Sequence, residues 1–458
     1  MSKIHFGSNP IEATTDCLTG RAGIASFAKF LHSLGLPRML AEAFPNLKKN
    51  GKGASTVDFF TSLLCWFMLG DSRHLSSFDD LKKEKCTQTL FGVEDVPGTA
   101  AVKRFLARFV AKHELRFRDI LSKLFLRRIR DVRPEVIFLG LDSMVMNNDD
   151  ASCRQGVDST YKRCLGYHPL QLTWMGMIID GMFRRGNRGT HEFENTVSML
   201  ERTVRLIRAE LGENIPIIIR MDAGYCDEKL MVYLNEELKV GFQVGGRLYE
   251  DFKQNISSIP EEAWSEYNSK GRSWKFMEMG FKCKSWGQYY RAVLTQVDSR
   301  EDGSLYLDFA RPTSLILTNL GQNRDLFGGE HEDELRCYMS AEAQVELYQG
   351  RGAEELCHRG LKDFGFEKMP SQNYATNMAI YHCMLIGFAA FETFKAEPLE
   401  GVVKLTSYAT TVRRKFIDIA AKITFHANKL SLKLRQEVID RLNLNGVWLH
   451  CCGSPPLG

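Results

Sequence analysis

Two aspartates each follow a strongly apolar, β-branched run in this 458-residue sequence. Asp142 comes after residues 136–141, within LGLDSM, and Asp222 comes after residues 215–221, within IIIRMDAGY. Such runs are typical of buried strands, and open α/β sheets commonly place functional groups where a strand ends. Because aspartate is also frequent in the turn that terminates a strand, each residue alone leaves both interpretations open.

Taken together, the two aspartates favour a divalent cation. Carboxylates that converge from one sheet repel each other, and the repulsion raises the pKa of one of them. A hard cation such as Mg²⁺ relieves that repulsion, since it takes oxygen ligands and commonly binds one or two carboxylates together with phosphates and water. Two such ions a few ångström apart can activate a water or a 3′-hydroxyl in phosphodiester chemistry. We therefore interpret Asp142 and Asp222 as candidate metal ligands.

A third candidate carboxylate lies in a segment with the spacing Tyr-x2-Arg-x3-Glu-x6-Lys. At about 100° per residue of helix, the four side chains share one face about 60° wide. A carboxylate flanked by two cations and a phenol suits a face that lies against a DNA backbone. The alternative is an amphipathic helix with a charged outer face, which leaves the fixed offsets of four residue types unexplained. The four residues are Tyr348, Arg351, Glu355 and Lys362.

This spacing, taken with LGLDSM and IIIRMDAGY, resembles the prokaryotic insertion-sequence DDE transposases that carry the Tyr-Arg-Glu-Lys signature. The resemblance covers roughly residues 55–425 and includes further short motifs. Those enzymes have an RNase H-like catalytic core, so the resemblance implies that fold here. The further motifs are Tyr167-His168-Pro169-Leu170, Arg185-Gly186-Asn187, Arg220-x-Asp222-x-Gly224 and Phe366-Glu367-Lys368-Met369-Pro370-Ser371.

The resemblance implies a reaction and a set of site residues. The enzyme would bind the inverted-repeat ends of an insertion sequence, cleave DNA and join the freed 3′-hydroxyl to target DNA. Since two ends need two active sites, it also implies a homodimer in the synaptic complex. Asp142, Asp222 and Glu355 would bind two Mg²⁺ or Mn²⁺ ions, and Tyr348, Arg351 and Lys362 would hold the phosphates of the transposon end.

Two other functions stay open on the sequence alone. A nuclease of the same fold would hydrolyse DNA without strand transfer, and a transposase-derived protein would bind DNA without any chemistry. The complete set of Asp142, Asp222 and Glu355 argues against a DNA-binding protein without chemistry, because carboxylates that bind no metal would be expected to be lost by mutation.

The elements that must position these residues predict an α/β protein with a mixed sheet. Within it, we expect strands over residues 170–179 and 182–185, a long helix over 192–211 and another helix over 411–426. The expected regions are a helical DNA-binding region (1–130), the first part of the RNase H-like core (131–248), a mostly β insertion (249–335), the second part of the core with the signature helix (336–395), and a helical C-terminal region ending in a loose tail (396–458).

Further DNA contacts are expected outside the core. Lys103, Arg104 and Arg108 follow the pattern of a basic helix that could belong to a helix-turn-helix module, although a helical scaffold with solvated basic side chains gives the same pattern. Trp286 is a candidate to stack on a flipped base, with a core position as the alternative. Arg413 and Arg414 are candidates for DNA contact or subunit pairing near the C-terminus.

Charge and cysteine content set the broad class. Residues 1–130 hold 21 Lys and Arg against 12 Asp and Glu, and residues 401–458 hold 9 against 3, so basic ends flank an acidic centre. This distribution suits a protein that grips a polyanion, although uneven surface charge would produce it too. The twelve cysteines include no CxxC, which disfavours zinc, and without a signal peptide we expect reduced thiols in a cytoplasmic protein.

Overall fold

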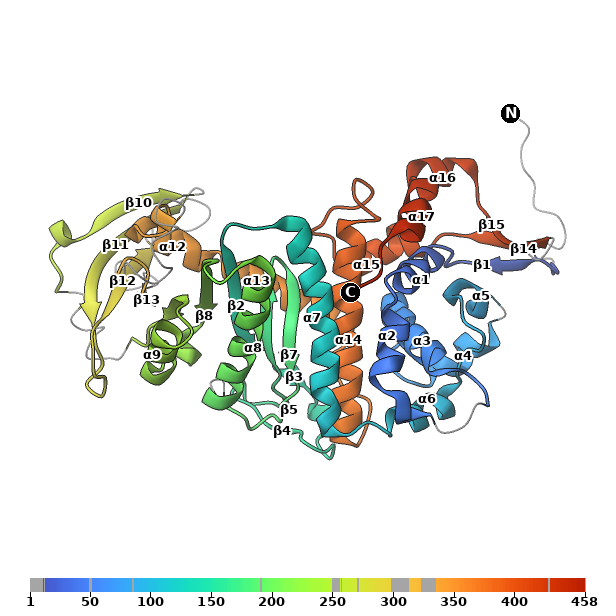
Figure 1. Ribbon diagram of the computed structural model, residues 1–458, viewed down its shortest axis with the longest axis horizontal. Helices are drawn as coiled ribbons and strands as arrows, with labels where there is room; N and C mark the ends of the chain where they lie inside the picture. Colours follow the sequence, from blue (N-terminus) through green and yellow to red (C-terminus); the bar gives the residue numbers. More distant parts are fainter. Residues whose placement is uncertain are drawn as a thin grey trace. The chain divides into compact units, whose positions relative to one another are not determined.

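The computed structural model describes residues 11, 13–48, 52–84, 86–189, 192–248, 256, 258–269, 272–297, 313–322, 335–426 and 429–457. The chain divides into two compact units. The central unit comprises Val110–Lys362 and Phe366–Ala389, and the terminal unit comprises Met1–Phe109, Asp363–Gly365 and Ala390–Gly458. In Figure 1 the terminal unit holds the blue and red ends of the chain.

The central unit is built on a mixed sheet that, in the described part of the chain, has nine strands in the order β10-β11-β12-β13-β9-β8-β2-β6-β7 (Figure 1). Strand β8 pairs in parallel with both β2 and β9, and the other neighbours are antiparallel. The expected mixed α/β class is therefore confirmed. The inner strands are β2 (Ile137–Ser143), β6 (Leu170–Trp174), β7 (Met177–Met182), β8 (Ile217–Met221) and β9 (Gly241–Gly245).

Strands β2 and β8 form where the sequence is most β-branched and apolar. Leu139, Leu141, Ile217 and Ile219 have no exposed surface, which is typical of parallel strands covered on both faces. Among the helices of this unit, α7 (Glu114–Val132) packs against β7 of the same sheet, and α8 (Phe193–Leu211) packs against α7. Helix α8 agrees closely with the predicted helix, because Val197, Leu200, Val204 and Ile207 recur at helical spacing and are all buried.

The strands predicted over residues 170–179 and 182–185 are wrong in their boundaries. Strands β6 and β7 form an antiparallel hairpin whose turn is Met175-Gly176. Both turn residues have positive φ, 47° and 81°, the conformation of the tight turns that suit the twist of a hairpin. The prediction missed this turn because Met175 gives no turn signal.

Four further strands extend the central sheet. Strand β13 pairs with β9, with Thr318 opposite Gln243, so the β-rich segment continues the sheet and does not form a separate one. The small helix α9 (Glu228–Glu236) connects β8 with β9. The four strands are β10 (Ser265–Ser269), β11 (Arg272–Phe281), β12 (Tyr290–Val297) and β13 (Thr313–Thr318).

After the sheet the chain returns to helices, as expected. Helices α12 (Ala341–Gln349) and α13 (Gly352–Phe364) are separated by a short break at Gly350–Arg351 and together carry the Tyr-Arg-Glu-Lys signature. Helix α14 (Tyr374–Ala396) is long and largely buried. No described helix combines the length and the apolar character needed to cross a membrane.

The terminal unit begins with short helices. Helix α3 (Thr56–Leu69) starts with a capping box in which the Ser55 hydroxyl accepts from the Asp58 N–H and the Asp58 carboxylate accepts from the Ser55 N–H. Its length is almost entirely buried, so it forms the core of this unit. The other helices are α1 (Ile24–Ser33), α2 (Leu36–Ala43), α4 (Ser77–Lys83), α5 (Thr87–Phe91) and α6 (Thr99–Leu106).

The helix predicted over residues 411–426 is wrong. Helix α15 (Ala409–Val412) ends in a single π turn, and the chain then forms strand β14 (Ala421–His426), paired with β1 (Cys17–Thr19) and β15 (Lys429–Lys433). The two pairing partners stabilise a strand that residues 421–426 alone did not indicate. The expected loose tail is also wrong, since α17 (Leu444–Gly453) buries Val447 and Cys451.

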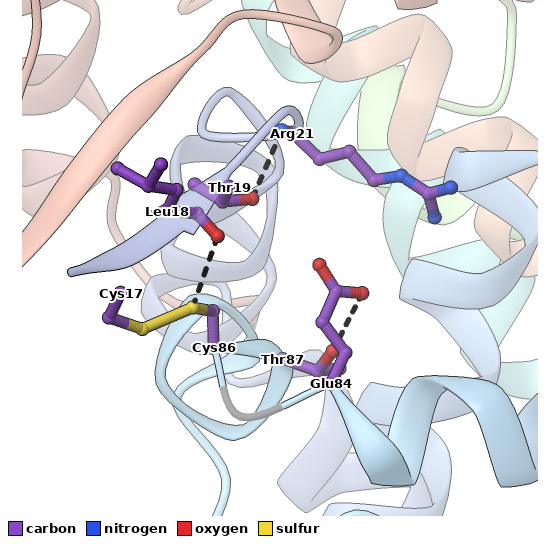
Figure 2. The surroundings of a disulfide bond; sticks show 7 residues. All are labelled: Cys17, Leu18, Thr19, Arg21, Glu84, Cys86 and Thr87. Atoms are coloured by element: carbon purple, nitrogen blue, oxygen red, sulfur yellow. Dashed lines mark hydrogen bonds between the residues drawn. A yellow bond between two sulfur atoms is a disulfide. The ribbon is translucent and has the colours of Figure 1, made fainter. Parts of the chain in front are cut away.

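Cys17 and Cys86 form a disulfide in the terminal unit (Figure 2). The expectation that all the cysteines are reduced is therefore wrong for this pair. The two cysteines are 69 residues apart in sequence, and only the placement of β1 beside the start of α5 brings them together. The remaining ten cysteines are free thiols.

Candidate active site

Asp142 and Asp222 lie on neighbouring parallel strands at the same level of the sheet. Strands β2 and β8 pair in a constant register that places Leu141 opposite Met221, so the two aspartates come next on both strands. Burial raises the pKa of Asp142 to about 6, the Ser143 N–H opposes this shift, and the charge of Asp222 adds to it. The charge of Asp222 therefore acts on Asp142, which agrees with the prediction that the two residues converge at one sheet edge.

A glutamate from α13 reaches the same face of the sheet, and that glutamate is Glu354. Gly140 and Asp142 share a face of β2 because alternate residues of a strand do so. A β-carbon on Gly140 would lie 2.1 Å from Glu354 Cδ, so the carboxyl group lies directly over the glycine. Glu354 is only 4% exposed. Burial raises its pKa to about 7, and the charges of Asp142 and Asp222 contribute in the same direction.

Arg220 joins this carboxylate to the break between the two signature helices. Its Nη2 lies 3.1 Å from Glu354 Oε1, and its Nη1 donates to the Leu347 carbonyl at the end of α12. Arg220 also lowers the pKa of Glu354, although less than burial raises it. Among the described residues, neither Glu354 oxygen has a hydrogen-bond donor with acceptable geometry. The Glu354 carboxylate is therefore close to the Arg220 cation, but its hydrogen-bonding capacity is not filled.

Tyr348 and Arg351, both predicted from the signature, are brought to the aspartates. A β-carbon on Gly245, which follows β9 residue Val244 and so lies beside Asp222, would come 2.5 Å from the Tyr348 hydroxyl. The Arg351 guanidinium lies 5.7 Å from the Tyr348 ring centre. Burial opposes the charge of Arg351, but Tyr348 and the nearby carboxylates produce a net rise in its pKa.

Glu355 and Lys362, the other two signature residues, are placed differently. Glu355 is exposed, and one residue of helix separates it from Glu354 by about 100°, so the two carboxylates leave α13 in different directions. Lys362 is partly exposed and forms an ion pair with Glu367. Among the described residues, no three His, Cys, Asp or Glu side chains lie close enough together to hold a metal ion.

Sequence reasoning missed two groups near Asp142. His358 lies one helical turn after Glu354, and its Nδ1 is 3.8 Å from Asp142 Oδ2. Burial lowers the pKa of His358 to about 4, so its ring is neutral at pH 7. Lys162, on the exposed loop before β5 (Leu165–Tyr167), lowers the pKa of Asp142 by its charge. The i, i+4 spacing of Glu354 and His358 could have indicated the first group; nothing in the sequence indicates the second.

The predicted DNA contacts of the terminal unit differ in exposure. Lys103, Arg104 and Arg108 are exposed on and just after α6, although the Arg108 guanidinium also donates to the Leu47 carbonyl. Arg414 is exposed as well. Arg413, by contrast, donates to four main-chain carbonyls of this unit, which makes it a structural bridge. Those carbonyls belong to Phe67, Met68, Asp363 and Phe364.

Trp286 lies in the central unit, on the connection between β11 and β12. Its ring packs edge-on against Phe281 and Tyr290, with ring centres 5.9 and 5.5 Å apart, and it is partly buried. This packing agrees with the alternative that Trp286 has a structural role. A flipped base could stack only on the part of the ring that stays exposed.

Comparison with known proteins gives one clear family match. The family model described as Transposase DDE domain group 1 matches residues 9–448. Among solved structures, the cryo-EM structure of a piggyBac transposase synaptic complex with hairpin DNA is similar at 12% identity and a TM-score of 0.39, over 86% of this chain and 80% of that chain. The search of curated proteins finds no match. Because the family model spans nearly the whole chain, the protein belongs to the DDE transposases of group 1.

Proposed function

We propose that this protein is the DNA transposase of an insertion sequence. It would bind the inverted-repeat ends, cleave DNA and join the 3′-hydroxyl ends to target DNA by transesterification. The observation that carries the proposal is the in-register placement of Asp142 and Asp222 on parallel strands, in a chain that belongs to the DDE transposases. The RNase H-like character of the core and the homodimer of the synaptic complex are parts of the same proposal.

The residues at the site fit a divalent cation. Asp142 and Glu354 have raised pKa values because they are buried close to other carboxylates, and a cation would relieve that cost. The candidate ligands Asp142, Asp222 and Glu355 all offer carboxylate oxygens, which Mg²⁺ and Mn²⁺ accept. When bound, two ions would supply an activated water or 3′-hydroxyl and would stabilise the leaving oxygen.

We assign the third ligand to Glu355 and a positioning role to Glu354. Glu355 has the signature spacing from Tyr348 and Arg351, and it is exposed, so it could share an ion with DNA and water. The Glu354 side chain packs on Gly140 and forms an ion pair with Arg220, and these two contacts hold the start of α13 in place. The competing assignment makes Glu354 the ligand, and its proximity to both aspartates favours it.

The cations around the carboxylates would hold the DNA. Arg351 faces the aspartates and is positioned by the Tyr348 ring, so it would neutralise the phosphate next to the reacting bond. Lys362 would release Glu367 to contact a second phosphate. On the terminal unit, the exposed side chains of Lys103, Arg104, Arg108 and Arg414 would contribute backbone contacts, whereas Arg413 would support them from within.

The test is a cleavage and strand-transfer assay on the element's own end sequence, with Mg²⁺ or with EDTA. Wild type is compared with Glu355→Gln and Glu354→Gln, and Glu342→Gln on α12 serves as the control. We expect Glu355→Gln to bind end DNA but to lose both cleavage and joining. Glu354→Gln should lose about 10- to 100-fold, as positioning residues near metals do, and the control should keep full activity.

The outcomes separate the alternatives. A reversed ranking of the two glutamate variants, with Mn²⁺ binding measured by calorimetry lost in Glu354→Gln and kept in Glu355→Gln, would make Glu354 the ligand. Cleavage without joined products would identify a nuclease of this fold. Sequence-specific DNA binding with no chemistry in wild type would identify a DNA-binding derivative.

A further inference from the structure

A polar cavity lies in the central unit, next to the Arg185-Gly186-Asn187 turn. Its volume is about 590 Å³. The turn follows β7, and its two exposed arginines, Arg185 and Arg188, flank the opening. The side chains that matter for a ligand are Arg184, Arg185, Arg188, Asn195, Asn373 and Tyr374.

The backbone of the turn that carries these arginines packs closely on neighbouring segments of the chain. Arg185 forms an isolated β-bridge with Tyr167. A β-carbon on Gly186 would lie 2.2 Å from the Gly166 carbonyl oxygen and 2.4 Å from that of Asp158. The backbone of the turn therefore packs directly on two neighbouring strands, and only glycine allows this close approach.

The cavity wall includes a buried cation, Arg184, whose Nη1 donates to the Gly189 carbonyl. Arg184 is 4% exposed; its Nε donates to the His168 carbonyl, and its Nη2 has no hydrogen-bond acceptor in the described chain. No carboxylate of the described residues lies within ion-pair distance of it. Of the two carboxylates in the wall, Glu114 accepts the Phe183 N–H, and Glu192 pairs with Arg188 of the same cavity at 2.7 Å, a pair that a bound phosphate would have to replace.

The N-terminus of a long helix adds to the positive field. Helix α14 has 23 residues and begins at Tyr374, which lines the cavity with Asn373. The Asn373 side chain caps the helix by accepting the Thr376 N–H. The Tyr374 N–H donates to Gln155, so the helix start would attract an anion through its positive dipole rather than through free N–H groups. The Arg185 guanidinium lies 6.0 Å from the Tyr374 ring centre, on the same wall.

One buried histidine ties the cavity to the catalytic strand. His168 Nδ1 is 2.9 Å from the Arg188 carbonyl oxygen, and its Nε2 is 2.8 Å from the Ser143 hydroxyl. The Ser143 N–H in turn donates to Asp142. A chain of hydrogen bonds through His168 and Ser143 therefore connects Arg188 with Asp142 at the end of β2.

We propose that this cavity binds a backbone phosphate of the DNA strand that continues from the reacting bond. The inference rests on the proposed function and extends it, since it names a phosphate contact beyond the signature residues. A phosphodiester suits the exposed guanidinium groups of Arg185 and Arg188, and the charge of the buried Arg184 and the dipole of the helix start would add to the attraction.

The test measures binding of fluorescent end DNA by anisotropy with Ca²⁺ in place of Mg²⁺, over a series of salt concentrations. The variants are Arg185→Gln, Arg188→Gln and the double variant. Arg205→Gln, an exposed arginine of α8 outside the cavity, removes the same charge and serves as the control. We expect the double variant to bind at least about tenfold more weakly, with the salt slope reduced by about one to two units, and the control to bind within about twofold.

A second measurement locates the phosphate and excludes a purely structural effect. End DNA with a single neutral methylphosphonate is tested at each position near the cleavage site. At one position the wild type should weaken while the double variant does not weaken further. Equal affinities for the double variant and the control, or a loss that no methylphosphonate reproduces, would overturn the proposal.

Two further results would also decide about the phosphate site. Thermal stabilisation by inorganic phosphate alone, with DNA affinity unchanged in the double variant, would make this a site for a free anion and overturn the proposal. Arginine-dependent DNA binding by a wild-type protein that neither cleaves nor joins DNA would support the phosphate site while refuting the transposase reaction.

Discussion

The carboxyl group of Glu354 occupies the space that a β-carbon on Gly140 would need, with 2.1 Å between that position and Glu354 Cδ. The glycine lies two residues before Asp142 on the same strand. The packing of α13 on the sheet therefore depends on the absence of one side chain, and the position of the signature helix is coupled to the strand that carries the first aspartate.

Gly140→Ala should displace Glu354 and destabilise the central unit. Overpacking a filled site typically costs about 1–3 kcal/mol in the free energy of unfolding. Urea denaturation measures this cost, with Gly189→Ala as the control because a β-carbon there meets nothing within 4 Å. In a Glu354→Ala background the same substitution should cost much less. An equal cost in both backgrounds would show that the two residues do not compete for this space.

Replacement of Glu354 should change how stability depends on pH. The pKa of Glu354 is about 7 in the folded protein and 4.5 as its ordinary value. A raised pKa favours folding below the ordinary value, and that contribution is lost as the pH rises through the folded value. Metal-free wild type should therefore lose stability between about pH 4.5 and 7, with about 3 kcal/mol as the upper bound from this group. Glu354→Gln should flatten the decline, and an unchanged slope would contradict the raised pKa.

Metal affinity should rise with pH in the range where Asp142 loses its proton. The pKa of Asp142 is raised to about 6, chiefly by burial, so an ion must displace a proton below that value. We expect Mn²⁺ affinity, measured by calorimetry without DNA, to increase from pH 5 to pH 7 and then to level off. Proton release, seen as a buffer-dependent heat, should fall over the same range. Affinity independent of pH would mean that Asp142 is not a ligand.

The sequence predicted the parts of the fold that local patterns control. The apolar run before Asp142 became β2, and the amphipathic run over residues 192–211 became α8 with one residue of difference. The meeting of Asp142 with Asp222 also followed, because both strands end in the same way. By contrast, the run 421–426 has neighbours from both ends of the chain, so tertiary pairing determined its conformation and the helix prediction failed.

At the site, spacing located the helix but not the direction of every side chain. The signature gave Tyr348 and Arg351, which the structure brings to the aspartates. It could not show that Glu354 would be buried over Gly140, because that contact depends on the angle at which α13 meets the sheet. Nor could it show Arg220 bridging two helices, since the Leu347 carbonyl is 127 residues away in sequence.

The Cys17–Cys86 disulfide should be measurable as two missing thiols and as a stability difference. Denatured, unreduced protein should react with ten equivalents of a thiol reagent and reduced protein with twelve. The bond links residues 69 apart, so its loss in Cys17→Ser should lower the free energy of unfolding by about 2–4 kcal/mol, chiefly by releasing the unfolded chain. Cys153→Ser, which removes an exposed free thiol, is the control and should change little. Twelve reactive thiols before reduction would show that the bond does not form, and Cys17→Ser should then be as stable as the control.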